Sequence, residues 1–300
     1  MRVFLTGGTG YVGSFLVKHF SKQSYELTVL ARDPSRSPEI VALPRVRIVQ
    51  DDIRNTDSLE PYLAGQDAII HNSLIWDMSG SEDSDEDCDV SNRLFVMAKE
   101  LAIPQILYTS STAVHRPFTR LMDESSVLYP ENMEPYAHVK HTSERSAIDK
   151  SLSSKTRVNI IRLGPVIGQT AFHSTRLKSD RTLEAIVRSA IEGRDIPLSE
   201  TAGRQFISGS DVPILYQAVL ESDCNREIFI AVDSKIIRWR DIAEIAIEAA
   251  QSKSKIISPP EEPERFDFNV DKIKRFFEID FDSREAIKSH VYQFVNQLKA

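Results

Sequence analysis

The stretch Thr6-Gly7-Gly8-Thr9-Gly10-Tyr11-Val12-Gly13 decides the fold. It follows a short apolar run that predicts a strand, and it opens a helix-like pattern. We expect a side chain at Gly7 to block the turn, one at Gly10 to keep backbone N–H groups from a pyrophosphate, and one at Gly13 to push helix and sheet apart. The helix N-terminus offers phosphates free N–H groups and a favourable dipole. The stretch predicts a dinucleotide site with contacts at Gly7, Thr9, Gly10, Tyr11, Val12 and Gly13.

Strand-like and helix-like segments alternate through the first half of the chain. The predicted strands are Arg2–Thr6, Leu27–Ala31, Val46–Gln50, Ala68–His71, Gln105–Ser110 and Val158–Leu163. The predicted helices are Tyr11–Lys22, Ser58–Leu63, Ser91–Leu101 and Tyr136–Lys150. This alternation predicts an α/β fold, a doubly wound parallel sheet (Rossmann fold), over residues 1–168. The acidic run Gly80–Asp89 predicts a solvated loop, with a mobile rim over the substrate cleft as the alternative.

The rhythm changes after Gly168. We expect helices at Thr182–Glu192, Val212–Leu220, Trp239–Gln251, Val270–Phe277 and Ser283–Leu298. A short apolar piece lies at Gln205–Ser208, a strand at Glu227–Val232, and a loop at Pro259–Pro263. We therefore expect residues 169–300 to form mainly a smaller C-terminal substrate-binding lobe. The same residues also supply the last sheet strand and helices of the Rossmann domain.

Bulk properties narrow the class of protein. The chain has 300 residues, enough to bury a sizeable core, and a net charge of −7, which gives no nucleic-acid footprint. Cys88 and Cys224 form no metal or disulfide motif, and no apolar run approaches the ~20 residues of a membrane span. The start of the chain lacks the pattern of a signal peptide. We expect a cytoplasmic protein with a small-molecule substrate and no nucleic acid, membrane or metal; a homodimer is possible.

The end of the second predicted strand bears on cofactor choice. An NAD enzyme usually places Asp or Glu there, on the ribose 2′-hydroxyl. Here the position holds Ala31, and Arg32 follows, which would pair with a 2′-phosphate. The sequence favours NADP(H); NAD(H) stays open because a one-residue shift would bring Asp33 to the ribose. After the third strand, Asp52 is expected to accept the adenine amino group, or else to begin a helix, and Ile53 to lie against the ring.

A tyrosine and a lysine stand four residues apart in Tyr136-Ala137-His138-Val139-Lys140, so a helix places both on one face. An adjacent ammonium is expected to lower the pKa of the phenol, which could then exchange a proton with a carbonyl or hydroxyl. Ser111 lies at the carboxyl end of the fifth strand, where open α/β sheets bind ligands. We predict Ser111, Tyr136 and Lys140 as catalytic residues, with Lys140 also gripping the nicotinamide ribose.

The order of these pieces resembles the extended short-chain dehydrogenase/reductase family, the NAD(P)-dependent epimerase/dehydratase group. The matching pieces are TGGTGYVG, DDIR, IIH at Ile69–His71, YTSSTAV, PYAHVK, RLGPVIG at Arg162–Gly168 and GRQFISGSDV at Gly203–Val212. The resemblance implies the same catalytic Ser111, Tyr136 and Lys140. It adds cofactor contacts at Asn72, Ser73, Leu74, Pro165 and Val166, and substrate contacts at Thr112 and Arg204, the latter where many members meet a nucleotide-sugar diphosphate.

Departures from the family pattern bear on the substrate. Asn72 follows the strand-4 histidine, the stretch Ser208-Gly209-Ser210-Asp211 replaces a usual His-Val-Asp-Asp, and Gly164-Pro165 lacks an asparagine; these changes point away from a UDP-sugar. The leading hypothesis is an NADP(H)-dependent oxidoreductase acting on a carbonyl/hydroxyl carbon. The alternatives are a nucleotide-sugar epimerase that retains its cofactor, and a catalytically silent dinucleotide-sensing regulator.

Overall fold

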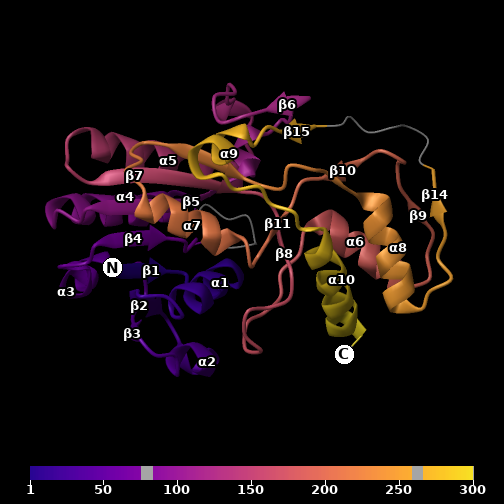
Figure 1. Cartoon of the computed structure of the whole chain (residues 1–300), viewed down its shortest axis with the longest axis horizontal. Helices are drawn as coiled ribbons and strands as arrows, with labels where there is room; N and C mark the ends of the chain where they lie inside the picture. The colour runs from indigo at the N-terminus through magenta and orange to yellow at the C-terminus, as the bar shows by residue number, and fades with distance from the viewer. Residues whose placement is uncertain (76–83, 259–265, 300) are drawn as a thin grey trace.

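The computed structural model describes residues 1–75, 84–258 and 266–299. Within them, seven parallel strands form the main sheet in the order β12-β7-β5-β4-β1-β2-β3 (Figure 1). These strands are β1 Arg2–Thr6, β2 Glu26–Ala31, β3 Val46–Gln50, β4 Ala68–His71, β5 Gln105–Ser111, β7 Arg157–Leu163 and β12 Ile228–Ala231. The predicted doubly wound sheet is confirmed. Because the strand order reverses between β1 and β4, a ligand crevice is expected outside their carboxyl ends.

Helices cover both faces of this sheet. They are α1 Tyr11–Phe20, α2 Pro38–Val41, α3 Glu60–Leu63, α4 Ser84–Glu100, α5 Pro135–Leu152, α7 Val212–Glu221 and α9 Asp271–Phe277. Alternate side chains of β1 point to opposite faces: Val3 and Leu5 pack with α1 and α7, whereas Phe4 packs with α4. Each β1 residue from Val3 to Leu5 is fully buried, so both layers are sealed at the centre of the sheet.

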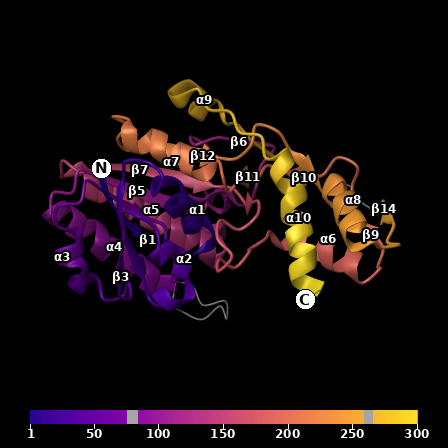
Figure 2. The same cartoon turned by 60° about the horizontal axis from the view of Figure 1, so that its bottom comes forward.

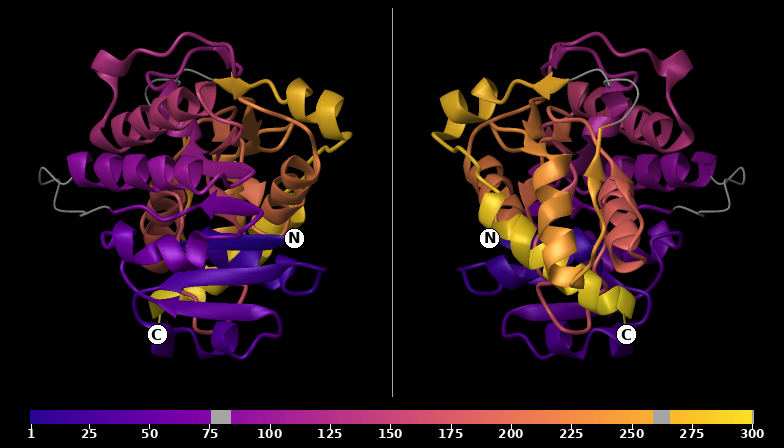
Figure 3. Two further views of the ribbon diagram at one scale, coloured as in Figure 1. Left: turned by 90° about the vertical axis from the view of Figure 1, so that its left-hand side faces the viewer. Right: turned by 90° about the vertical axis from the view of Figure 1, so that its right-hand side faces the viewer.

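A smaller helical lobe follows the strand β7. It contains α6 Arg181–Ile191, α8 Trp239–Ala250 and α10 Arg284–Lys299, which lie side by side in Figure 2 and face the viewer in the right-hand view of Figure 3. Their shared apolar core also includes Tyr11 and Phe15 of α1. The lobe therefore packs directly against the helix that begins at the glycine turn.

Short elements complete the described chain. The two-residue strands are β6 Leu121–Met122, β8 Val166–Ile167, β9 Ile196–Pro197, β10 Gly203–Arg204, β11 Ile207–Ser208, β13 Ile237–Arg238, β14 Ile256–Ile257 and β15 Asp267–Phe268. The 3-10 turns are η1 Pro34–Arg36, η2 Thr56–Leu59, η3 Thr112–His115 and η4 Pro130–Asn132. Residues beyond 168 return to the sheet, because β12 pairs with β7.

The acidic run was predicted incorrectly. Helix α4 begins at Ser84 rather than Ser91, so residues 84–89 are helical and not a loop. Acidic side chains in a first helical turn interact favourably with the helix dipole, which explains why the run extends the helix. Residues 80–83 of this run and the predicted loop Pro259–Pro263 lie outside the described residues.

Candidate functional site

The glycine turn has the geometry of a phosphate cradle. Gly7 has a φ of +68°, and a Cβ there would lie 2.8 Å from the backbone of Asn72 and Ser73. A Cβ on Gly13 would lie 2.1 Å from the Gly7 carbonyl oxygen, so the turn itself, rather than the sheet, is the nearest obstacle there. At Gly10 a Cβ would meet, among the described atoms, only that carbonyl oxygen at 3.3 Å. The Gly10 position is therefore open on its outer side, as close approach of a diphosphate requires.

A threonine that the sequence reasoning missed ties the two strand ends together. The Oγ1 atom of Thr6 accepts the N–H groups of Asn72 and Ser73, each at 3.0 Å, and lies 2.9 Å from Nδ1 of His71. Burial lowers the pKa of His71 to about 3, so the ring is neutral. Because Thr6 Oγ1 accepts two hydrogen bonds, its proton goes to Nδ1, and His71 Nε2 donates to Ser91 Oγ at 2.9 Å. The only local signal was a hydroxyl directly before a glycine turn.

The remaining predicted cofactor contacts are placed unevenly. The Tyr11 hydroxyl donates to the carbonyl oxygen of Gly168 at 2.8 Å, and its side chain is buried, which leaves the main chain of Tyr11 for a phosphate. Pro165 and Val166 follow β7 and are half-buried. The Pro165 carbonyl oxygen accepts the Ile207 N–H, and Val166 is the strand-pairing partner of Ile207. Other half-buried members of the predicted set are Thr9, Val12, Asn72, Ser73 and Leu74.

The end of β2 presents an exposed cation next to a carboxylate that caps the following turn. Ala31 is the last residue of the strand, and Arg32 after it is exposed. Both Ser35 N and Ser35 Oγ donate to Asp33 Oδ1, at 3.1 Å and 2.5 Å. Asp33 therefore caps the turn η1 instead of projecting freely toward a ribose.

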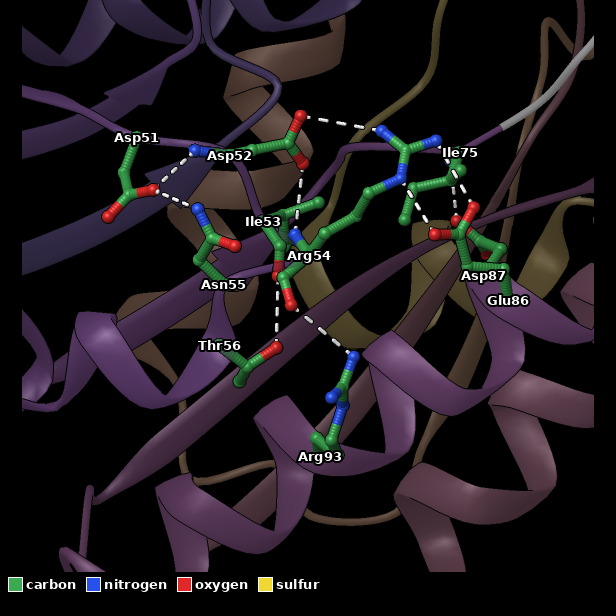
Figure 4. A network of polar contacts seen from close by, with 10 residues as sticks. All are labelled: Asp51, Asp52, Ile53, Arg54, Asn55, Thr56, Ile75, Glu86, Asp87 and Arg93. Atoms are coloured by element: carbon green, nitrogen blue, oxygen red, sulfur yellow. Dashed lines mark hydrogen bonds and ion pairs between the residues drawn. The ribbon is translucent and has the colours of Figure 1, made fainter.

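Asp52 belongs to a polar network that reaches α4 (Figure 4). Its Oδ1 accepts the Arg54 N–H at 2.9 Å, and its Oδ2 lies 3.4 Å from the Arg54 guanidinium. Arg54 in turn makes two hydrogen bonds to Glu86, at 2.7 Å and 3.1 Å. Asp52 is thus partly engaged, while Ile53 beside it is buried.

The three predicted catalytic residues come from β5 and α5. Ser111 is the last residue of β5, and its Oγ accepts the Ala113 N–H at 3.2 Å, which caps η3. Tyr136 is the second residue of α5, after Pro135, and has a hydrogen bond to Ser111. One turn later, buried Lys140 donates from Nζ to the Thr109 carbonyl oxygen at 2.9 Å. Strand end and helix start thus bring the serine and tyrosine hydroxyls together.

The electrostatics of this group differ from the prediction. Burial raises the pKa of Tyr136, Asp87 raises it further, and only the Ser111 hydrogen bond lowers it. The prediction of a phenol pKa lowered by Lys140 is therefore wrong for this structure, because burial is the largest influence on the pKa of Tyr136 and raises it. Burial also lowers the pKa of the Lys140 ammonium, against which Asp87 and then Glu144 act.

A buried ion pair anchors α5 to the sheet. Arg162 of β7 donates from Nε and a terminal nitrogen to the two carboxylate oxygens of Glu144, at 2.9 Å and 2.8 Å. Its other terminal nitrogen lies 3.1 Å from Nε2 of His115, in the turn after Ser111. Burial and then Arg162 lower the pKa of His115 to about 3, so Nε2 accepts this bond. The sequence signal was an arginine inside an apolar strand.

The two predicted substrate contacts are less accessible than expected. Thr112 is buried. Arg204 makes an ion pair of 2.6 Å with Asp180, whose other oxygen accepts two N–H groups at the start of α6; the side chains are 16% and 9% exposed. The Nε of Arg204 has no hydrogen-bond partner among the described residues. The charge that a diphosphate would need is therefore already paired.

An aromatic cluster lies next to the turn η3. It consists of His115, Phe118, Phe266 and Phe268, with ring centroids 4.3 to 6.2 Å apart in the contacting pairs. The Arg116 guanidinium lies 5.2 Å from the Phe118 centroid. His115 and Phe268 are buried, so Phe118 and Phe266 are the half-buried members of the cluster that leave some apolar surface beside the segment that carries Ser111.

A cavity of about 650 Å³ shares Phe268 with this aromatic cluster and is also lined by residues that include Gln205, Lys235 and Lys274. No predicted catalytic residue lines it. Within the described ranges, no group of three His, Cys, Asp or Glu side chains is placed to hold a metal ion. The helices in that part of the chain include none long and apolar enough to cross a membrane.

Residues 3–231 match the NAD dependent epimerase/dehydratase family. The chain belongs to this family. The resemblance read from the motifs, to the NAD(P)-dependent epimerase/dehydratase group of the extended short-chain dehydrogenase/reductase family, is confirmed.

Relatives in this family include reductases. Anthocyanidin reductase of Arabidopsis thaliana is 26% identical over 68% of this chain, and the match spans 65% of that enzyme, just under two thirds of its length. An uncharacterized protein of Saccharomyces cerevisiae is 22% identical over 82% of this chain and 79% of its own. The 3-beta-hydroxysteroid dehydrogenase of Mycolicibacterium neoaurum is 29% identical over 38% of this chain and 32% of its own.

Solved structures of the family show the same fold. The UDP-glucuronic acid 4-epimerase from Bacillus cereus, in complex with NAD, has a TM-score of 0.82 at 18% identity, with both chains fully covered. The UDP-Glc/GlcNAc 4-epimerase from Campylobacter jejuni has a TM-score of 0.83 at 17% identity over 99% of each chain. At such identities the likeness concerns the fold alone.

Proposed function

We propose that this protein is an NADPH-dependent reductase of a carbonyl carbon, with Ser111, Tyr136 and Lys140 at its centre. The observation that carries the proposal is the contact between the Ser111 and Tyr136 hydroxyls at the carboxyl end of β5. Because burial raises the pKa of Tyr136, its proton is retained at neutral pH. A phenol that keeps its proton is suited to donate it to a carbonyl oxygen as reduction proceeds.

The residues present fit a dinucleotide. The open outer side of Gly10 and the helix N-terminus after it suit a diphosphate. When bound, the nicotinamide supplies the hydride. Ser111 would hold the substrate oxygen, Tyr136 would donate the proton to that oxygen, and Lys140 would bind the nicotinamide ribose.

The choice of NADP(H) rests on the end of β2. Exposed Arg32 is available to pair with a 2′-phosphate, while the nearest acid, Asp33, is occupied by Ser35. A guanidinium bonds a phosphate with charge-assisted hydrogen bonds, and a free carboxylate there would repel it. NAD(H) is the alternative outcome of the test below.

An apolar ketone is favoured over a nucleotide sugar. The pairing of Arg204 with Asp180 removes the free cation that a sugar diphosphate needs. The half-buried rings of Phe118 and Phe266, with centroids 4.3 Å apart, offer apolar surface that a planar or steroid-like skeleton can pack against, while Phe268 of the same cluster is buried. Two relatives carry names of such activities, anthocyanidin reductase and 3-beta-hydroxysteroid dehydrogenase.

Cofactor titration tests the first half of the proposal. NADPH should bind more tightly than NADH in a fluorescence titration. Arg32→Ala should reduce the difference in binding free energy between the two by about 1–3 kcal/mol, the scale of a charge-assisted hydrogen bond. Arg36→Ala removes an exposed cation from the same turn and serves as the matched control. Equal affinities in the unaltered protein would refute the choice of NADP(H).

The state of the purified protein tests the second half. A reductase must release its cofactor after each turnover, so mass spectrometry of freshly denatured protein should find little nucleotide. NADPH consumption should appear in a screen of apolar ketones. Near-stoichiometric NAD, with activity on nucleotide sugars and no added cofactor, would instead identify an epimerase. Tight binding of NADPH with no turnover of any ketone would favour a regulator.

A further inference from the structure

Asp87 is a buried carboxylate that the predicted catalytic set does not use. It lies in the first turns of α4, and its side chain is 2% exposed. Its Oδ1 accepts the Ile75 N–H at 2.6 Å, as Figure 4 shows, while Oδ2 is buried with no hydrogen-bond partner among the described residues. A buried carboxylate with one hydrogen bond is costly unless a positive charge lies near it.

The positive charge nearby is Lys140. Helix α4 packs on α5, and the Cys88 thiol lies 3.8 Å from the Val139 carbonyl oxygen, so the residue next to Asp87 contacts the turn that carries Lys140. Of the charged groups around it, Asp87 acts most strongly to hold up the pKa of Lys140 against burial, followed by Glu144 and Cys88.

The other titratable groups around this pair are neutral or already paired. Burial lowers the pKa of His71 to about 3, and burial holds the pKa of Tyr108 well above its usual value. The Lys140 Nζ lies 5.0 Å from the Tyr108 ring centroid, so that ring forms part of its floor. Glu144 is bound to Arg162 by two hydrogen bonds. Asp87 is thus the carboxylate near Lys140 that has no cation of its own.

We propose that Asp87 is a positioning residue of the active site, acting as the counter-charge of the Lys140 ammonium and holding the loop after β4 through Ile75. The inference rests on the proposed function for the role of Lys140 at the ribose. An uncharged lysine would bind the ribose and orient Tyr136 less well, and Asp87 keeps the charged form present at higher pH.

Asp87→Asn removes the charge and keeps an oxygen that can accept the Ile75 N–H. NADPH affinity is measured by fluorescence from pH 6 to pH 10. As the pH rises, the variant should lose this affinity at a pH about one unit lower than the unaltered protein does. At pH values above both midpoints the Kd of the variant should be roughly tenfold higher than that of the unaltered protein, since one pKa unit is a tenfold change. Asp85→Asn makes the same charge change at an exposed site in the same helical turn and should leave the profile unmoved. Identical profiles for the two variants would overturn the inference.

A double-mutant cycle on stability tests the pair without any activity. Lys140→Met strands the Asp87 carboxylate, so it should lower the urea midpoint strongly, and much less so in the Asp87→Asn background. Equal losses in both backgrounds would overturn the inference. If Asp87→Asn does not fold, the test uses Lys140→Met alone. The stability that this variant loses relative to the unaltered protein should shrink as the pH falls, because the stranded carboxyl becomes protonated. A loss of stability that does not change with pH would overturn the inference. Coupling without any ketone reduction would leave this inference intact and remove the proposed function.

Discussion

Replacing Arg162 by methionine should strongly destabilise the protein, because it leaves the Glu144 carboxylate buried without its partner. Both side chains are nearly inaccessible, 3% and 2% exposed, and two charge-assisted hydrogen bonds join them. Removing one member of a buried ion pair costs about 3–5 kcal/mol. The stranded carboxyl can instead take up a proton, which sets an upper limit on this cost. For an ordinary glutamate pKa of about 4.3, the free energy of protonation is about 4 kcal/mol at pH 7 and about 1 kcal/mol at pH 5.

Urea unfolding followed by circular dichroism measures this effect. At pH 7 the loss should be about 4 kcal/mol, and it should fall toward about 1 kcal/mol at pH 5. The sign follows because a stranded carboxyl binds a proton more readily in the folded state, so stability is lost as the pH rises. Adding Glu144→Leu should recover much of the loss, since apolar replacement of a buried pair is often near neutral.

An exposed pair provides the control. Arg188 lies 2.7 Å from Glu184 one helical turn away, with side chains 50% and 38% exposed. Arg188→Met should cost no more than about 0.5 kcal/mol at either pH. An Arg162→Met loss as small as this, or one that does not change with pH, would refute the reasoning.

Three further predictions concern other parts of the molecule. Tyr136→Phe should cut turnover of a confirmed ketone roughly 10²–10⁴-fold with NADPH affinity nearly unchanged, and full turnover in a spectrophotometric assay would remove Tyr136 from the mechanism. Gly13→Ala should lower the free energy of unfolding by about 1–3 kcal/mol in thermal unfolding, because its Cβ would lie 2.1 Å from a carbonyl oxygen. Gly10→Ala should fold normally and lose NADPH binding. A Gly10→Ala protein less stable than Gly13→Ala would contradict the cradle geometry. Burial raises the pKa of Asp233 to about 7, so its contribution to stability falls as the pH rises from about 4 to about 7; Asp233→Asn, which can still accept from Ser283, should gain stability relative to the unaltered protein over that range.

Local chemistry explains what could be predicted from the sequence. The bounds of β1, β3 and β4 match the predicted ones, since short runs of apolar and β-branched residues between turn residues specify a strand locally. The glycine turn needs a positive φ at Gly7, which residues with a side chain rarely adopt, and leaves no room for a Cβ atom at Gly13. The four-residue spacing of Tyr136 and Lys140 places both on α5 by helix geometry alone.

The composition of the acidic run misled the prediction. Asp85 and Asp89 are exposed, as a solvated segment requires, but Asp87 between them is buried against the β4 loop. Nothing in a run of similar acids distinguishes the one that turns inward. Its environment depends on the packing of α4 against α5, which the local pattern does not specify.

By itself the sequence determined the Rossmann fold, the dinucleotide cradle and the candidate Ser111, Tyr136 and Lys140, because each depends on neighbours a few residues away. Only the tertiary structure decided how these groups are charged and paired. Arg204 is matched to Asp180, and Tyr136 has a raised rather than a lowered pKa. Both results depend on desolvation and on charges distant in sequence, whose effect varies with separation in space and not with spacing along the chain.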